Sequence, residues 1–559
     1  MKLAFSAAVL PLGLAIYGTA LAQTPPSAGS INQQIEREQA PRPAKAAPDI
    51  RIEQGAVPAT PAADHQKILV KSLRVTGARI YPEATLLAVS GFGAQQELTL
   101  SELRAMAAKI TGHYRKDGYF LAQAYLPAQD IKDGVVAIAV LEGQYGQVSM
   151  HNSAKVSDGL TNGVLDGLES GDTVAIAPLE SRLLMLSDIP GVNVKSTLVP
   201  GASVGVSDLI VDVTPGRPVS GSIDADNHGN RYTGANRLGA ALNINNPSGY
   251  GDLVNLRALT SDAGLHYGRA AYQAQIGRAK AGAAYSYMEY RLGRNFSSLQ
   301  ARGTATIASL YGSYPLIRSR SHSLYAQINL EAKKFQDRVD ATSTVADKKA
   351  RVAMMSLNGD TRDSIGGGGL STYSLTWSSG SIDIQSPLAL AADASTVRSN
   401  GHYDKLSFQA MRLQSVTESI SLYGAIAGQF ASKNLDTSEK IGLGGPAGVR
   451  AYPSGEAYGD QGYVLNLEAR ALLPKFSDRL PGQMQLVGFI DTGSVTLNKN
   501  AWSAGQNRRS LSGIGIGFNW IDPNNFMLSA SLARKLGNAV ATSAPDANSR
   551  FWLQGVKYF

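Results

Sequence analysis

The chain has 559 residues, a formal net charge of +8 and a mean hydropathy of −0.11. That hydropathy suits a water-soluble protein and equally a transmembrane β-barrel, whose strands alternate between a lipid-facing and a wet face. The sequence has no cysteine, which excludes disulfides, thiolate zinc sites and cysteine nucleophiles. The basic residues form no run interleaved with aromatic residues, so we expect no nucleic-acid partner.

The first residues carry the pattern of a secretory signal peptide. Lys2 precedes an apolar stretch from Leu3 to Ile16, and Ala20-Leu21-Ala22 forms an A-x-A-like cleavage site. We expect residues 1–22 to be removed on export. A transmembrane helix is the alternative, but the stretch is short for a hydrocarbon core of about 30 Å. Because no later run of about 18 apolar residues follows, a membrane-embedded mature chain would have to be a closed barrel.

The next segments predict a small helix on a tether. Residues 23–39 contain a polar stretch, 30–38, that predicts a short helix with Ser30 as its N-cap. Residues 40–66 are rich in proline and alanine and predict an extended, poorly packed linker. The helix could be a mobile plug or part of a disordered end, and composition alone favours disorder.

Residues 67–143 and 144–216 each predict a unit of strand, two helices and two strands, which makes an internal repeat. The clearest helix is 101–115, with Ser101 as a possible cap. Its apolar residues recur at the helical spacing and form one face, namely Leu103, Met106, Ile110 and Tyr114.

From residue 217 to 559 the helical period gives way to segments of about ten residues that alternate strictly. In the segment from Leu324 to Lys333 the apolar residues face one way, and the other face carries both signs of charge. This pattern favours an antiparallel transmembrane barrel of about sixteen strands over a soluble β-sandwich. The aromatic Phe559 ends the segment predicted to close the barrel.

Several motifs resemble TpsB-type two-partner secretion transporters of the outer membrane (FhaC/ShlB/HxuB-like), which belong to the BamA superfamily. Tyr114 to Phe120, Tyr125 to Asp130 and Leu141 to Gly143 resemble the first POTRA domain of that family. Residues 144–216 resemble its second POTRA domain, and 226–252 resemble its first barrel hairpin.

The most specific resemblance is to the sixth loop of that family, which folds into the barrel. Val449-Arg450-Ala451-Tyr452, within about 442–461, resembles its Val-Arg-Gly-Tyr motif, with Ala451 in place of glycine. Phe489, Asp491 and Gly493 resemble the Phe-x-Asp-x-Gly strand motif. The resemblance implies that Arg450 pairs with Asp491 inside the barrel, and an Arg fork suits a carboxylate on an inner wall. Lys557 departs from the apolar residue usual near the C-terminus.

The resemblance implies a protein of the Gram-negative outer membrane with its POTRA domains in the periplasm. These would recognise a secreted TpsA-type exoprotein (an adhesin, haemolysin or toxin) for export through the barrel. Residues 23–39 would form a plug helix. Other expected partners are outer-membrane lipid and the barrel-assembly machinery, with Phe559 as its C-terminal signal. The cargo-binding candidates in the first POTRA domain are Leu103, Met106, Ile110, Tyr114, Tyr125 and Gln129.

The sequence carries no pattern typical of an enzyme. It has no Walker P-loop, no HExxH and no nucleophile elbow, so we expect no catalysis, no cofactor and no metal. Two other functions remain open. One is a barrel-assembly or insertase chaperone of the same superfamily, and the other is a passive channel or receptor, which has no need of two POTRA units.

Overall fold

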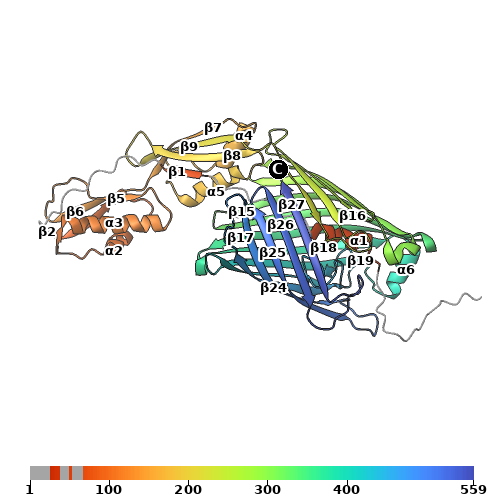
Figure 1. Cartoon of the computed structure of the whole chain (residues 1–559). Helices are drawn as coiled ribbons and strands as arrows, with labels where there is room; N and C mark the ends of the chain where they lie inside the picture. The colour runs from red at the N-terminus through yellow and green to blue at the C-terminus, as the bar shows by residue number, and fades with distance from the viewer. Residues whose placement is uncertain (1–24, 38–48, 53–66) are drawn as a thin grey trace, which may run out of the picture.

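The computed structural model describes residues 25–37, 49–52 and 67–559. It shows two small α+β domains followed by a large barrel with a helix inside it (Figure 1). The predicted signal peptide and most of the predicted linker lie outside the described residues. None of the helices in the described ranges is long and apolar enough to cross a membrane.

The helix inside the barrel is α1, Ala28–Arg37. It begins earlier than the sequence predicts, so the assignment of Ser30 as the N-cap is wrong. Ser27 precedes the helix, and its hydroxyl accepts the backbone N–H of Ser30 at 3.4 Å. The Ser30 hydroxyl in turn accepts the backbone N–H of Ser27 at 3.0 Å. Two serines three residues apart thus satisfy amides at the helix start reciprocally, in the manner of a capping box.

The first POTRA domain packs two helices on a small sheet. Its central strand, β6 (Val135–Leu141), runs parallel to β3 (Ser72–Thr76) and antiparallel to β5 (Gln123–Tyr125). A separate short pair joins β2 (Lys67–Val70) to β4 (Gln96–Thr99). The helices are α2 (Glu83–Ser90) and α3 (Leu100–Lys116). Thr99 caps α3 in a capping box with Glu102, so the predicted cap Ser101 is wrong.

The second POTRA domain repeats this arrangement in the predicted order. Strand β9 (Val206–Pro215) lies between β7 (Gln144–Asn152), which is parallel to it, and β8 (Val192–Pro200), which is antiparallel. The helices are α4 (Asp158–Leu165) and α5 (Ile176–Ser187). The domain contacts the adjacent turns of the barrel, where Arg318 Nε donates to Asp188 Oδ2 at 2.8 Å.

Part of the predicted linker is a strand. Residues Asp49–Ile52 form β1, which pairs in parallel with β8 at the edge of the second POTRA sheet. These four residues are extended, as expected, but they are paired with a sheet, so the expectation of a poorly packed linker is wrong for them. Proline and alanine content cannot reveal such a short segment, because its pairing partner lies more than a hundred residues further along the chain.

Sixteen antiparallel strands close the barrel, with β10 and β27 paired at the seam. A closed barrel pairs every strand edge, as a lipid environment requires. The strands are β10 (Val219–Asp226), β11 (Arg237–Asn245), β12 (Leu253–Ser261), β13 (Leu265–Ile276), β14 (Ala279–Arg291), β15 (Ala301–Arg318), β16 (His322–Val339), β17 (Thr344–Asp363), β18 (Gly369–Ile384), β19 (Gly401–Ser415), β20 (Ile420–Ala431), β23 (Gln461–Leu472), β24 (Gln483–Thr496), β25 (Arg508–Asp522), β26 (Phe526–Lys535) and β27 (Ser549–Tyr558).

The barrel wall has the two faces that the alternation predicts. Ile328 and Leu330 of β16 are exposed on the outside, as are Leu486 and Ile490 of β24. Asp491 is buried on the inner side of β24. A short helix, α6 (Pro387–Ser395), follows β18 at the end of the barrel away from the POTRA domains (Figure 1).

A buried carboxylate, Glu142, ties together three parts of the first POTRA domain. Its Oε1 accepts the backbone N–H of Arg79 at 2.7 Å, that of Ile80 at 2.8 Å and the Tyr114 hydroxyl at 2.9 Å. Burial raises the pKa of Tyr114, and the bond to Glu142 raises it further, so the phenol stays a donor.

We expect Glu142→Ala to destabilise this domain by about 3 kcal/mol, because three donors lose their acceptor. In the full-length protein, hydrogen exchange at the amides of β6 should become roughly a hundredfold faster. Glu97→Ala, at an exposed position of β4, is the control and should change little. Unchanged exchange in Glu142→Ala would show that these bonds do not hold the domain together.

Candidate functional site in the barrel lumen

The barrel lumen is occupied by the segment that joins β20 to β23, residues 432–460, called loop 6 here. Two short strands, β21 (Ile441–Gly442) and β22 (Tyr458–Gly459), pair within it. Beyond them the chain turns back on itself, since the backbone N–H of Val449 donates to the Leu443 carbonyl at 2.8 Å. This fold presents residues 449–452 to the wall formed by β23, β24 and β25.

Arg450 is the inner anchor of loop 6, and the structure brings it together with Asp491. Nη2 donates to Asp491 Oδ1 at 2.7 Å and Nε to Asp491 Oδ2 at 2.9 Å, which makes a bidentate pair. Nη1 donates to Glu468 Oε1 at 2.8 Å. The guanidinium also lies 3.5 Å from the ring centroid of Phe489, in cation–π geometry.

The surroundings make this contact costly to break. The Asp491 side chain is fully buried and that of Arg450 is 12 % exposed. Asn466 Nδ2 donates to Asp491 Oδ1 at 2.7 Å and to the Gly448 carbonyl at 2.8 Å, which links wall and loop again. Trp552 Nε1 donates to the Arg450 carbonyl at 2.7 Å. A buried carboxylate that loses its cation is strongly unfavourable.

Glycines on the wall make room for the loop. A Cβ on Gly513 would lie only 2.5 Å from the Cβ of Ala451, and one on Gly493 would lie 2.9 Å from Leu443 Cδ2. Ala451 is fully buried and does not adopt positive φ, so its methyl fits where the family motif has glycine. Tyr452 is also fully buried, and its hydroxyl donates to the Ala539 carbonyl at 3.1 Å.

Two further carboxylates, those of Glu456 and Asp460, hold the C-terminal part of loop 6. Glu456 accepts the backbone N–H groups of Thr542 and Ser543, each at 2.8 Å, and pairs with Arg509 Nη2 at 2.8 Å. Asp460 pairs with Lys440 Nζ at 2.8 Å and accepts the backbone N–H of Lys499 at 2.7 Å. Both carboxylates are fully buried.

A third group of ion pairs fixes residues 434–440 of loop 6, called the first limb here, to other strands of the barrel. Glu439 lies between Lys333 of β16, at 2.9 Å, and Lys405 of β19, at 2.7 Å. Asp436 pairs with Lys348 of β17 at 2.7 Å. The sequence analysis missed these residues, although the alternation placed Lys333 on the polar face. Their partners lie tens of residues away, so no local spacing could reveal them.

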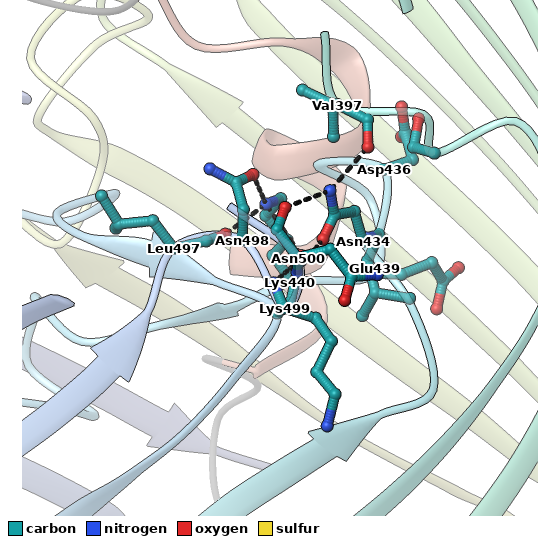
Figure 2. Close-up of polar contacts among 12 residues, drawn as sticks. Val397, Asn434, Asp436, Glu439, Lys440, Leu497, Asn498, Lys499 and Asn500 are labelled. Atoms are coloured by element: carbon teal, nitrogen blue, oxygen red, sulfur yellow. Dashed lines mark hydrogen bonds and ion pairs between the residues drawn. The ribbon is translucent and has the colours of Figure 1, made fainter. Parts of the chain in front are cut away.

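Hydrogen bonds from the side chains of Asn434 and Lys440 join this limb to neighbouring loops, as Figure 2 shows. Asn434 Nδ2 donates to the Val397 carbonyl at 2.7 Å and to the Asn500 carbonyl at 2.9 Å. Lys440 Nζ donates to the Leu497 carbonyl at 2.6 Å. The limb is therefore held by the loops after β18 and β24 as well as by the wall.

Helix α1 fits between loop 6 and the wall. The backbone N–H of Ala28 donates to Asp337 Oδ1 of β16 at 2.8 Å, an acidic contact that suits a helix N-terminus. On the loop side, the Ser27 hydroxyl lies 2.9 Å from that of Thr437. A Cβ on Gly29 would lie 2.6 Å from the Cβ of Ser438, so only glycine permits this approach. Ile31 and Ile35 pack into an apolar cluster that includes Tyr232, Met288 and Phe335.

Next to α1 the lumen remains open as a polar cavity of about 530 Å³. Its lining includes Glu36 of the helix together with Arg269, Asn329 and Glu331 of the wall. These side chains carry both signs of charge, which suits water. A polar space therefore remains in the lumen beside α1.

The predicted cargo-binding residues of the first POTRA domain are mostly core residues, and this prediction is wrong for four of them. Leu103, Met106, Ile110 and Tyr114 belong to its buried hydrophobic cluster. The amphipathic face of α3 packs on the domain's own sheet, so it lines no open groove.

The other two candidates lie elsewhere. Tyr125 is exposed on the short strand β5. The Gln129 side chain accepts the N–H of Ala137 at 2.7 Å and donates to its carbonyl at 2.8 Å. It thus makes the two hydrogen bonds that the main chain of a paired strand would make. Phe559 lies at the seam, where its N–H donates to the Gly221 carbonyl at 3.1 Å, and its side chain is exposed on the outside.

A closed sixteen-stranded barrel with an inward loop, a luminal helix and two POTRA domains places the protein in the class of transmembrane β-barrels that carry POTRA domains. The family model of the haemolysin secretion/activation proteins ShlB/FhaC/HecB matches residues 205–520, and the POTRA domain model of ShlB type matches residues 68–143. The chain therefore belongs to the ShlB/FhaC/HecB family. It is an outer-membrane transporter of two-partner secretion.

Relatives and solved structures agree with this membership. The heme/hemopexin transporter protein HuxB of Haemophilus influenzae is 27 % identical over 99 % of this chain and 98 % of its own length. The outer membrane transporter CdiB of Dickeya dadantii is 23 % identical over 65 % of each chain. The structure of CdiB from Escherichia coli shares the fold, with a TM-score of 0.70 at 22 % identity over 90 % of this chain and 93 % of that one.

We expect Arg450→Ala to lower the free energy of unfolding of the barrel by about 3–5 kcal/mol, because buried Asp491 loses its cation. The double variant Arg450→Ala with Asp491→Ala should recover part of that loss, and urea unfolding of the full chain in detergent measures both. Arg302→Ala, which breaks an exposed pair with Asp340, is the control and should cost under about 1 kcal/mol. Equal losses in Arg450→Ala and Arg302→Ala would contradict the assignment of an inner anchor.

Proposed function

We propose that the barrel lumen is the path of the exported protein and that α1 and loop 6 are its two closures. The observation that carries this is the manner of their attachment. Loop 6 packs Leu443 and Val449 in an apolar cluster with the wall. Its other contacts with the wall are ion pairs and hydrogen bonds at Arg450, Glu439 and Glu456. Such contacts exchange for water contacts at modest net cost when a segment leaves as a whole.

The order of events follows from the packing. Helix α1 touches loop 6 through Thr437 and Tyr458, so it covers part of the loop that must rearrange. We propose that α1 leaves first and that loop 6 then shifts, with the Arg450–Asp491 pair as the contact that sets its resting position. Folding of the cargo outside the cell is the driving force that needs no nucleotide.

The partner we propose is a secreted exoprotein of the adhesin, haemolysin or toxin kind, recognised in the periplasm by the POTRA domains. Family membership supports a secreted partner, and the relatives differ in what their names state, heme/hemopexin transport in one and CdiB in another. We further propose no catalysis, cofactor or metal, because the members of the family are transporters.

We propose that the remaining parts serve targeting and insertion. Residues 1–22 would direct export and be removed, and the mature chain would run from the plug region 23–39 through the linker 40–66, the POTRA domains 67–143 and 144–216, and the barrel 217–559. The exposed aromatic Phe559 beside β10 supports recognition by the barrel-assembly machinery. The exposed apolar residues of the outer wall, such as Ile328 and Leu486, support a lipid contact.

Export of a candidate exoprotein, chosen from the genes next to that of this chain, tests the proposal. We expect wild-type cells to release it, and cells with residues 67–216 deleted or with Arg450→Ala to release at least about tenfold less, while the barrel still resides in the outer membrane. Immunoblots of culture medium and membranes measure both. Equal release in all three strains would point to a passive channel. Loss of other outer-membrane barrels instead would point to an assembly chaperone.

We expect Ile31→Ala with Ile35→Ala to loosen the plug. Each substitution removes buried methyl groups and costs about 2 kcal/mol or more, so α1 should leave the lumen more often. In planar bilayers the open fraction of single channels should rise at least about tenfold. The control is Glu36→Gln on the same helix, which faces the cavity and should keep the wild-type fraction. An unchanged open fraction in the double variant would show that α1 does not close the pore.

A further inference from the structure

Strand β1 occupies an edge of the second POTRA sheet that would otherwise be unpaired. The sheet order is β1-β8-β9-β7, so β8 has β9 on one side and only β1 on the other. In this parallel pair Asp49 is aligned with Lys195, Arg51 with Thr197 and Ile52 with Leu198. An extended segment of the chain is thus already bound to β8 by strand addition, which shows that this edge accepts one.

The pairing of β1 is short, and the two of its side chains that the structure describes are exposed. Four residues of β1 align with β8, whereas nine residue pairs join β8 to β9. The side chains of Arg51 and Ile52 are exposed, Ile52 to 43 %. A net gain of about 0.5–1.5 kcal/mol per hydrogen bond makes so short a strand displaceable. A longer segment that continues along β8 would form more main-chain bonds and replace it.

We propose that β1 is a placeholder on the cargo-binding edge of the second POTRA domain, and that an extended segment of the secreted partner displaces it from β8. This inference rests on the export function proposed above and names the surface that performs recognition. Main-chain bonding explains how β-rich partners of different sequence are accepted, and the exposed side chains of β8, such as Lys195, offer selectivity.

The place of β1 in the chain links this edge to the plug. Twelve peptide steps separate Arg37, the end of α1, from Asp49, which limits their separation to about 40 Å. Once β1 is released, the next described attachment is Lys67 at the start of β2, thirty steps from Arg37, and the limit becomes about 100 Å. Cargo bound to β8 therefore frees the tether of α1, so capture and opening are parts of one event.

The absence of cysteine from the sequence allows a direct test. Arg51→Cys with Thr197→Cys places two thiols at aligned positions of β1 and β8. Joining them with a short, reducible bifunctional thiol reagent should lower export of the partner at least about tenfold, and reduction should restore it. Each single-cysteine variant, treated in the same way, should export normally.

A second pair of variants tests the edge itself. Ile50→Pro with Arg51→Pro removes adjacent amide donors, and one of any two neighbouring donors in a parallel strand faces its partner. A labelled peptide copying residues 47–54 should bind this full-length variant at least about tenfold more tightly than the wild type, whose edge is occupied. Ile50→Ala with Arg51→Ala keeps both amides and should bind the peptide less tightly than the proline variant.

The outcomes separate this inference from the function on which it rests. If the uncrosslinked protein exports nothing, the export function itself fails. If it exports and the crosslinked protein exports equally well, the placeholder role of β1 is overturned. Equal peptide affinity for the wild type and the proline variant would likewise overturn it, because the edge would then be open or unable to bind.

Discussion

The main-chain hydrogen bond in a lipid environment is the constraint on which the rest of this structure depends. No water is present there to pair with an exposed N–H or carbonyl group, so a sheet that crosses the membrane must close on itself. Closure by sixteen strands leaves an interior too wide for wall side chains to fill. Water can occupy such an interior, but here α1 and loop 6 take up part of it.

The wet inner wall then determines how these segments are held. Helix α1 packs through Ile31 and Ile35 against the aromatic cluster, and loop 6 places Leu443, Val449 and Tyr452 in a buried apolar cluster with the wall. Loop 6 is held by carboxylates that each find several donors, as Asp491, Glu456 and Glu439 show. Such contacts fix one arrangement firmly while it persists, since each buried charge needs all its partners.

Much of this fold could be predicted from the sequence, because it follows from local periodicity. The alternation along 217–559 predicts the barrel and its two faces. The meeting of Arg450 with Asp491 was instead implied by the resemblance to the family motifs. The caps at Ser27 and Thr99 were missed by three and two residues, since several serines and threonines can cap a nearby helix start.

Other features depend on contacts that no local pattern encodes. Strand β1 needs a partner in another domain, and Glu439 needs lysines from two distant strands. Leu103 and Tyr114 show a different difficulty. The sequence pattern of an amphipathic helix is the same whether its apolar face is covered by its own domain or by a ligand.

The contact between Ala451 and Gly513 has a consequence for how this sequence can change. The methyl group of Ala451 takes the space that a side chain at position 513 would need. A residue larger than glycine at 513 would therefore require glycine at position 451, whereas a change at 513 alone would break the fit of loop 6. The two positions are epistatic, and the history of one constrains the mutational paths open to the other.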